Sequence, residues 1–182
     1  YIVPDDLRQN LESKGFEVGV HDLRHDGTLF SSESTFRKQA RCIQRHVQAW
    51  NAAGFRAGFM FHNLDWIHQL GVQYDASTFD TDPFEPQPGG VGTIFPFWVP
   101  APSSFTQKAQ PHPGSDRGYV ELPYTLPQDS TLFFILQEQG IEIWKRKLDW
   151  IVRHRGMALL NVHPDYIQFE DESPRRRAYP VR

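Results

Sequence analysis

The stretch that decides the fold reads Phe16-Glu17-Val18-Gly19-Val20-His21-Asp22-Leu23-Arg24-His25. Its first half, residues 16–20, alternates between apolar and small or polar side chains, a pattern that predicts a β-strand. The second half is polar, so we expect the strand to end at His21. Functional side chains of parallel α/β folds gather at the ends of such strands. The stretch therefore predicts a strand with a candidate site directly beyond it.

Helical patterns lie on both sides of this strand. Asp5 and Asp6 can cap a helix that runs to about Lys14, where Gly15 stops it. Ser31 or Ser32 caps a second helix, which Gly54 ends. Its apolar positions follow the helical period: Phe36, Ala40, Ile43, Val47 and Trp50.

Strands and helices continue to alternate along the rest of the chain. We expect strands at 55–61, 72–75, 119–122 and 157–162, and helices at 63–70, 129–139 and 141–155. The segment 157–162 is almost wholly apolar, as a parallel strand buried on both faces requires. The alternation predicts a parallel α/β fold, and 182 residues suit one domain over 1–182.

Composition excludes several classes of protein. The net charge is −3 and both signs are spread along the chain, which gives no phosphate-tracking surface for nucleic acid. We interpret the basic run 175–177, which follows acidic residues, as a solvated loop. Cys42 is the single cysteine, so an intrachain disulfide and a thiolate metal cluster are excluded. No apolar run is long enough for a membrane span, and the sequence indicates no compartment.

A segment rich in Pro and Gly, 81–118, interrupts the alternation. A loop of this length within a compact domain is usually functional or disordered, and its aromatic residues favour an ordered, functional loop. Trp98 could offer a platform for a sugar ring, while a packed cover over the fold is an equally good interpretation.

A few side chains could carry chemistry. His21 and His25 form an H-x-x-x-H pair that can meet one divalent cation if the backbone turns. His163 follows the apolar segment 157–162, where an imidazole can act as a general acid or simply be a surface side chain. Arg56 opens a predicted strand, and ordinary turn chemistry explains the aspartates at 75, 80 and 82.

The order of these pieces resembles the polysaccharide deacetylases of the NodB-homology type, carbohydrate esterase family four. Residues 16–25 are similar to the family's second motif, in which a strand delivers two metal-binding histidines. Residues 55–59 resemble the third motif, with Gly58 in place of its proline, and residues 74–82 fall where the fourth belongs. Residues 160–164, Leu-Asn-Val-His-Pro, resemble the fifth motif. The resemblance covers nearly the whole chain.

This resemblance implies a distorted (β/α) barrel and hydrolysis of an N-acetyl or, less often, an O-acetyl group on a carbohydrate. His21 and His25 would bind a divalent metal of the zinc type, and His163 would protonate the leaving amine. Arg56 would orient the catalytic base, and Asp80 or Asp75 would orient His163. Leu160 would shape the acetyl pocket.

The family's first motif, a pair of aspartates that supplies the third metal ligand and the base, would precede Tyr1. We therefore expect a barrel that is incomplete at both ends. Its open sheet edge predicts association, for example with a second copy. Two alternatives remain: a non-catalytic carbohydrate-binding relative, and a hydrolase of small C–N substrates.

Overall fold

The computed structural model describes residues 3–82, 84, 89–102, 118–169 and 178–180. The chain forms two compact units. Unit 1 comprises Tyr1–Thr78, Glu85–Gly89 and Pro96–Leu122, and unit 2 comprises Phe79–Phe84, Gly90–Phe95 and Pro123–Arg182. Whether the two units form one domain, as the sequence predicts, stays a prediction.

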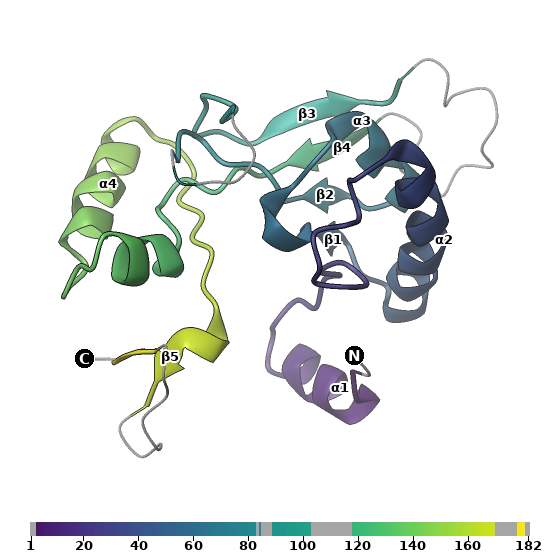
Figure 1. Ribbon diagram of the computed structural model, residues 1–182, viewed down its shortest axis with the longest axis horizontal. Coiled ribbons are helices and arrows are strands. Elements are labelled where there is room, and N and C mark those ends of the chain that lie inside the picture. The colour runs from purple at the N-terminus through teal and green to yellow at the C-terminus, as the bar shows by residue number, and fades with distance from the viewer. Residues whose placement is uncertain (1–2, 83, 85–88, 103–117, 170–177, 181–182) are drawn as a thin grey trace. The chain divides into compact units, whose positions relative to one another are not determined.

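Unit 1 is built on a small open sheet with strand order β1-β2-β4-β3 (Figure 1). Its strands are β1 (Gly54–Phe55), β2 (Tyr74–Asp75), β3 (Phe97–Pro100) and β4 (Gly118–Glu121). The strands β1, β2 and β4 run parallel, and β3 is antiparallel to β4. The parallel register places Asp75 opposite Glu121. The three parallel strands thus end at one edge of the sheet.

The expected strand over residues 16–20 shortens to a single parallel bridge between Val20 and Phe55. The Val20 N–H donates to the Gly54 carbonyl, and the Val20 carbonyl accepts from the Arg56 N–H. Val20 is buried, whereas Phe16 is exposed. With only its last residue anchored in the core, the segment keeps just the pairing that positions His21.

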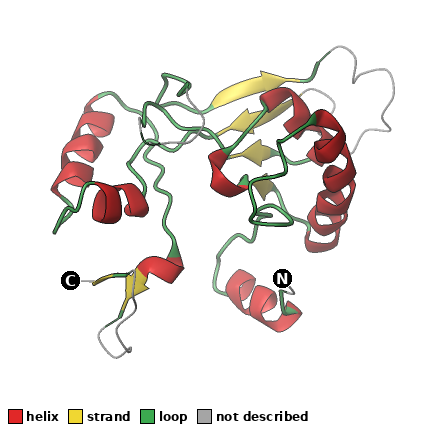
Figure 2. Ribbon diagram, viewed as in Figure 1, coloured by secondary structure: helices red, strands yellow, loops and turns green. Residues whose placement is uncertain are grey.

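The helices of unit 1 agree well with the sequence (Figure 2). They are α1 (Asp5–Ser13), α2 (Glu33–Trp50) and α3 (Leu64–Ile67), with 3-10 turns at Gly58–Met60 and His68–Leu70. The Ser32 hydroxyl caps α2 by accepting the Thr35 N–H, and Asn63 caps α3 in the same way. However, α2 ends at a left-handed Asn51 rather than at Gly54.

One face of α2 packs into the core of unit 1. Its buried side chains are Phe36, Ala40, Ile43 and Val47. Burial of a large apolar side chain contributes about 1.5–3 kcal/mol, so this stripe holds the helix to the sheet. The stripe confirms the helical period that the sequence shows.

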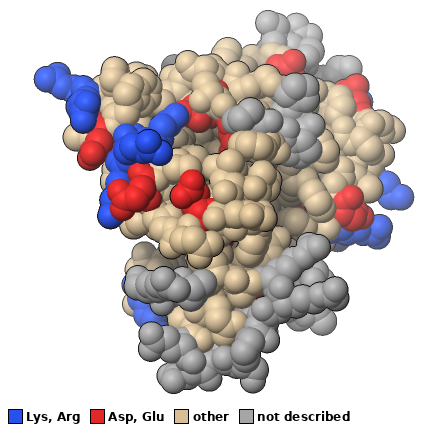
Figure 3. All heavy atoms as spheres, turned by 60° about the vertical axis from the view of Figure 1, so that its left-hand side comes forward, with Lys and Arg blue, Asp and Glu red and all other residues tan. Residues whose placement is uncertain are grey.

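Unit 2 contains α4 (Glu142–Arg153), a π-helical turn at Thr131–Ile135, a 3-10 turn at Pro164–Tyr166, and the short parallel strands β5 (Ile167–Gln168) and β6 (Tyr179–Pro180). On α4, Ile151 is buried and the Trp144 indole donates to the Pro127 carbonyl. Acidic and basic side chains lie close together on the face that Figure 3 shows. On α4, the Lys145 ammonium lies 2.7 Å from Glu142 Oε1.

Two sequence predictions in unit 2 need correction. The helix expected over 129–139 begins at Asp129 as predicted but ends with the π-helical turn Thr131–Ile135, because the backbone turns left-handed at Gln137. The segment 157–162 is extended but forms no strand ladder. Thr125 pairs with it instead: the hydroxyl donates to the Met157 carbonyl and accepts the Leu159 N–H, and the Thr125 N–H donates to the Leu159 carbonyl.

The structure is therefore a mixed α/β fold with a small open sheet, and a complete barrel is not formed by the described residues. The Pro-rich segment 81–118 contains β3, which the sequence did not predict, while residues 83, 85–88 and 103–117 of it lie outside the described part. Among the described residues, no helix is long and apolar enough to cross a membrane.

Candidate functional site

The bridge between Val20 and β1 positions the His21 imidazole in unit 1. Its Nδ1 lies 3.0 Å from the Arg56 carbonyl oxygen. A carbonyl can only accept, so Nδ1 carries the proton and Nε2 keeps its lone pair. Burial, more than the neighbouring charges, holds the pKa of His21 below its usual value. The ring is therefore neutral and presents Nε2, the form that binds a metal ion.

The turn after His21 places a carboxylate and a second imidazole beside it. Asp22 adopts a left-handed backbone, with φ of 64°. Its Oδ1 accepts the Leu23 N–H at 2.6 Å, whereas its buried Oδ2 has no hydrogen-bond partner among the described residues. Burial, the largest influence, raises the pKa of Asp22. The His25 ring centroid lies 5.2 Å from that of His21.

Gly58 is the close neighbour that makes this turn possible. A Cβ at this position would lie 3.1 Å from Asp22 Oδ2 and 3.4 Å from the His25 ring. The proline that the family pattern places here would add more atoms in that space. The replacement by glycine therefore matches the tight packing of the His21–His25 turn against the 3-10 turn Gly58–Met60.

The two histidines fit part of a zinc site. Imidazoles that share one tetrahedral zinc through nitrogen at about 2.0–2.1 Å have ring centroids on the order of 5 Å apart, which the observed separation matches. However, no group of three or more His, Cys, Asp or Glu side chains that could hold a metal occurs within the described residues. His21 and His25 can supply two ligands, and a third must come from elsewhere.

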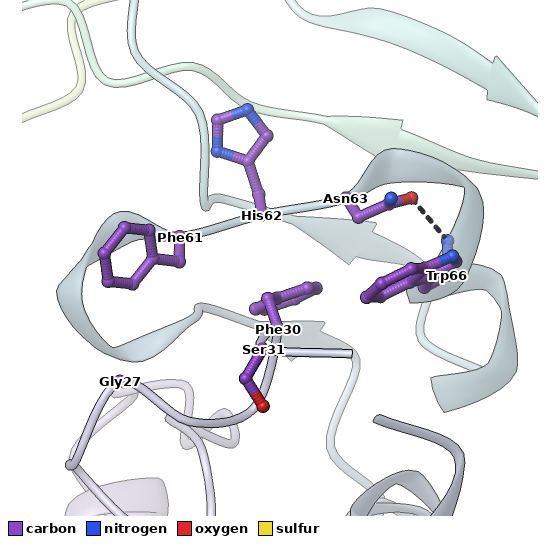
Figure 4. A pocket seen from close by; sticks show the side chains of 7 residues that line it. All are labelled: Gly27, Phe30, Ser31, Phe61, His62, Asn63 and Trp66. Carbon is purple, nitrogen blue, oxygen red and sulfur yellow. Dashed lines mark hydrogen bonds between the residues drawn. The ribbon is translucent and has the colours of Figure 1, made fainter. Parts of the chain in front are cut away.

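An open cavity of about 230 Å³ lies near this turn in unit 1 (Figure 4). Its lining consists of Gly27, Phe30, Ser31, Phe61, His62, Asn63 and Trp66. The rings of Phe30 and Trp66 are nearly parallel, and a Cβ on Gly27 would contact the rings of both Phe59 and Phe61. The Phe59 ring in turn lies 4.7 Å from that of His25. Aromatic walls with a few polar groups suit a sugar ring.

In unit 2, His163 is held by a buried aspartate. The His163 Nδ1 lies 2.6 Å from Asp129 Oδ1, and the His163 backbone N–H donates to Asp129 Oδ2 at 2.8 Å. The Asp129 side chain is fully buried, while that of His163 is 35% exposed. Since Nδ1–H points to the carboxylate, Nε2 is the nitrogen available for proton transfer.

The partner of His163 corrects a sequence prediction. We expected Asp80 or Asp75 to orient the imidazole, but Asp129 does so. The Asp80 carboxylate instead accepts from Lys147 at 2.6 Å and from the Thr81 N–H. Asp75 is completely buried and accepts from the Ser77 hydroxyl. In the sequence, Asp129 begins the helix expected over 129–139 and precedes an apolar run, a position typical of a helix cap.

Tyr179 and Phe133 complete the surroundings of Asp129. The Tyr179 hydroxyl donates to Asp129 Oδ2 at 2.9 Å, and the Tyr179 ring stacks on Phe133 at 4.1 Å. Burial alone would raise the pKa of Asp129, but the hydrogen bonds from His163 and Tyr179 outweigh it and hold the pKa below its usual value. Asp129 therefore stays a carboxylate and can stabilise a protonated imidazole.

The remaining predicted site residues are Arg56, Trp98 and Leu160. The Arg56 backbone contacts both Val20 and His21, and the role of its side chain stays a prediction. Trp98 in β3 is 52% exposed, so its ring is accessible to a ligand. Leu160 is half-buried in the extended segment beside Thr125. The role in binding of both residues remains a prediction.

Comparison with known proteins supports the fold. The chain is similar to the crystal structure of a "putative polysaccharide deacetylase" from Mycobacterium smegmatis, with a TM-score of 0.59 and 20% identity over 87% of this chain. The chain spans about half the length of that protein, 53%. No model of a protein family matches the sequence, and no curated protein matches it. At this identity the likeness concerns the fold.

The depressed pKa of Asp129 gives a prediction about stability and pH. In the folded protein the pKa of Asp129 lies below its unfolded value of about 3.9. The Asp129–His163 pair therefore stabilises the fold above about pH 3.9, and this stability is lost as the pH falls through the folded pKa of Asp129. Urea unfolding of the wild type and Asp129→Asn from pH 7 to pH 3 measures this. We expect the wild type to be more stable at pH 7 and the difference to shrink below about pH 4. A difference that stays constant would contradict the assignment.

Proposed function

We propose that this chain belongs to a metal-dependent hydrolase that removes acetyl groups, N-acetyl foremost, from a polysaccharide or exopolysaccharide precursor. The observation that carries the proposal is the pair in which buried Asp129 holds a half-buried His163. Such an arrangement serves proton transfer, because the carboxylate fixes the tautomer and stabilises the imidazolium. The similar fold and the order of the sequence motifs support the deacetylase type.

His21 and His25 are the residues that would hold the metal, through imidazole nitrogens that zinc accepts readily. When bound, a zinc ion supplies a water of lowered pKa and polarises the carbonyl of the acetyl group. His21 already presents Nε2 as a neutral ligand. We propose that the third ligand and the general base are carboxylates outside the described residues, and that Arg56 orients that base.

His163 would act on the leaving group. With Nδ1–H donated to Asp129, a protonated Nε2 can give its proton to the amine nitrogen as the C–N bond breaks. Asp129 offsets the positive charge of the imidazolium before that transfer. Leu160 would line the space for the acetyl methyl group, and Trp98 would stack on a sugar ring.

The metal assignment predicts a loss of bound ion in a double variant. The protein should bind about one zinc per molecule by atomic absorption, and His21→Ala/His25→Ala should bind none. His46→Ala is the matched control, because His46 is exposed on α2 and its ring contacts that of Trp50. A double variant that retains its zinc would place the site elsewhere.

The assignment of His163 predicts a loss of rate without a loss of metal. Removing a general acid costs about 10²–10⁴-fold, so His163→Ala should lower acetate release from acetylated oligosaccharides by that factor and keep its zinc. His154→Ala, on an exposed imidazole of unit 2, should leave the rate unchanged. Sugar binding without any acetate release from the wild type would instead favour the non-catalytic alternative.

A further inference from the structure

A buried pair of carboxyl groups lies at the carboxyl ends of the central strands β2 and β4 in unit 1. Neither group has a part in the proposed chemistry. Asp75 and Glu121 face each other across β2 and β4, and both are 0% exposed. Their side chains are hydrogen-bonded to one another. Two carboxylates in contact inside a protein cannot both be charged, so the pair must share a proton.

The surrounding donors show which carboxyl carries that proton. Asp75 accepts from the Ser77 hydroxyl at 2.7 Å and from the Ser77 N–H at 3.2 Å. Glu121 Oε1 accepts from both the Thr78 hydroxyl and the Thr78 N–H, while Oε2 has no donor. Burial raises the pKa of both carboxyls, but the hydrogen bond between them raises the pKa of Glu121 further, to about 10, and lowers that of Asp75. Glu121 is therefore the neutral partner, and Asp75 is the acceptor.

Charged Asp75 fixes the direction of the Ser77 hydroxyl. Because Ser77 Oγ–H donates to Asp75, the oxygen lone pairs face away from the carboxylate and one of them accepts the Ala57 N–H at 2.9 Å. Ser77 and Ala57 are both fully buried, so water cannot replace this bond. Chains of hydrogen bonds of this kind strengthen one another in a low dielectric.

The Ala57 N–H and the Arg56 carbonyl belong to the same planar peptide group. That carbonyl is the acceptor of His21 Nδ1. A rotation of this peptide would move both hydrogen bonds at once. A continuous chain therefore connects the buried carboxyl pair, through Ser77 and one peptide plane, to the imidazole of His21.

We propose that Ser77 is a positioning residue that fixes the orientation and tautomer of His21 through the 56–57 peptide, with the Asp75–Glu121 pair as its anchor. The proposal rests on the proposed function insofar as His21 is a metal ligand. Groups of this kind behind a metal-binding histidine hold its ring and tautomer, and their loss costs about 10–100-fold in metal affinity. Here the support passes through a backbone amide instead of reaching the ring directly.

The His21 tautomer in the metal-free protein tests the proposal directly. Long-range proton–nitrogen NMR should show His21 protonated at Nδ1 in the wild type. Ser77→Ala should lower the fraction of that tautomer, and Ser77→Cys, which keeps the side-chain volume but offers a weaker acceptor, should lower it less. Ser77→Thr, which keeps the hydroxyl, should restore the wild-type spectrum.

Tyr119→Phe is the matched control, because it removes another buried hydrogen bond of unit 1, from the Tyr119 hydroxyl to the Leu64 carbonyl. It should leave the His21 tautomer unchanged. A His21 spectrum that is the same in the wild type, Ser77→Ala and Ser77→Cys would overturn the proposal.

Metal affinity, measured by competition with a chelator, separates this proposal from the proposed function. We expect about 10–100-fold weaker zinc binding by Ser77→Ala and unchanged binding by Tyr119→Phe. Equal zinc binding by the wild type and Ser77→Ala would contradict the positioning role while leaving the hydrolase proposal intact. If the wild type binds no zinc, the hydrolase proposal fails, and the tautomer measurement still decides the role of Ser77.

Discussion

The shared proton between Asp75 and Glu121 is the constraint on which unit 1 depends. It lets two acidic side chains occupy the buried ends of neighbouring strands. If both were charged, the repulsion and the loss of hydration would cost several kcal/mol. With one proton between them, the pair becomes a rigid set of acceptors to which the residues after β2 attach. These residues hold the 56–57 peptide, whose carbonyl accepts from His21. The geometry of the turn that carries His21 and His25 therefore depends on the buried residues of the sheet.

Local features of the fold could be predicted from the sequence, whereas non-local pairings could not. The helix α2 follows from its own apolar period and from its Ser32 cap. The strands expected at 16–20 and 157–162 depend on neighbours. The first keeps one bridge, and the second keeps hydrogen bonds to Thr125 and Ile94 without a strand ladder. β3 is a four-residue strand within a segment rich in Pro and Gly, and the sequence pattern there does not indicate a strand.

The candidate site likewise combines residues that local pattern predicts with residues that depend on distant parts of the chain. His21, His25 and His163 could be proposed as candidates because each follows a predicted strand, and that position depends on local pattern alone. Asp129 was missed because an aspartate before an apolar run has the signature of a helix cap, and its contact with His163 spans 34 residues. Ser77 and Glu121 were missed as well, since their importance depends on the register of β2 with β4. Partners that orient a functional residue come from elsewhere in the chain.

The measurement that tests the account most directly is an anomalous-scattering map at the zinc absorption edge, from crystals of the natural protein grown with zinc. The account predicts a peak at about 2.0–2.1 Å from Nε2 of His21 and a nitrogen of His25, with His21 Nδ1 still bonded to the Arg56 carbonyl. A peak at other residues, or zinc bound to Nδ1 of a His21 ring that has left Arg56, would contradict it.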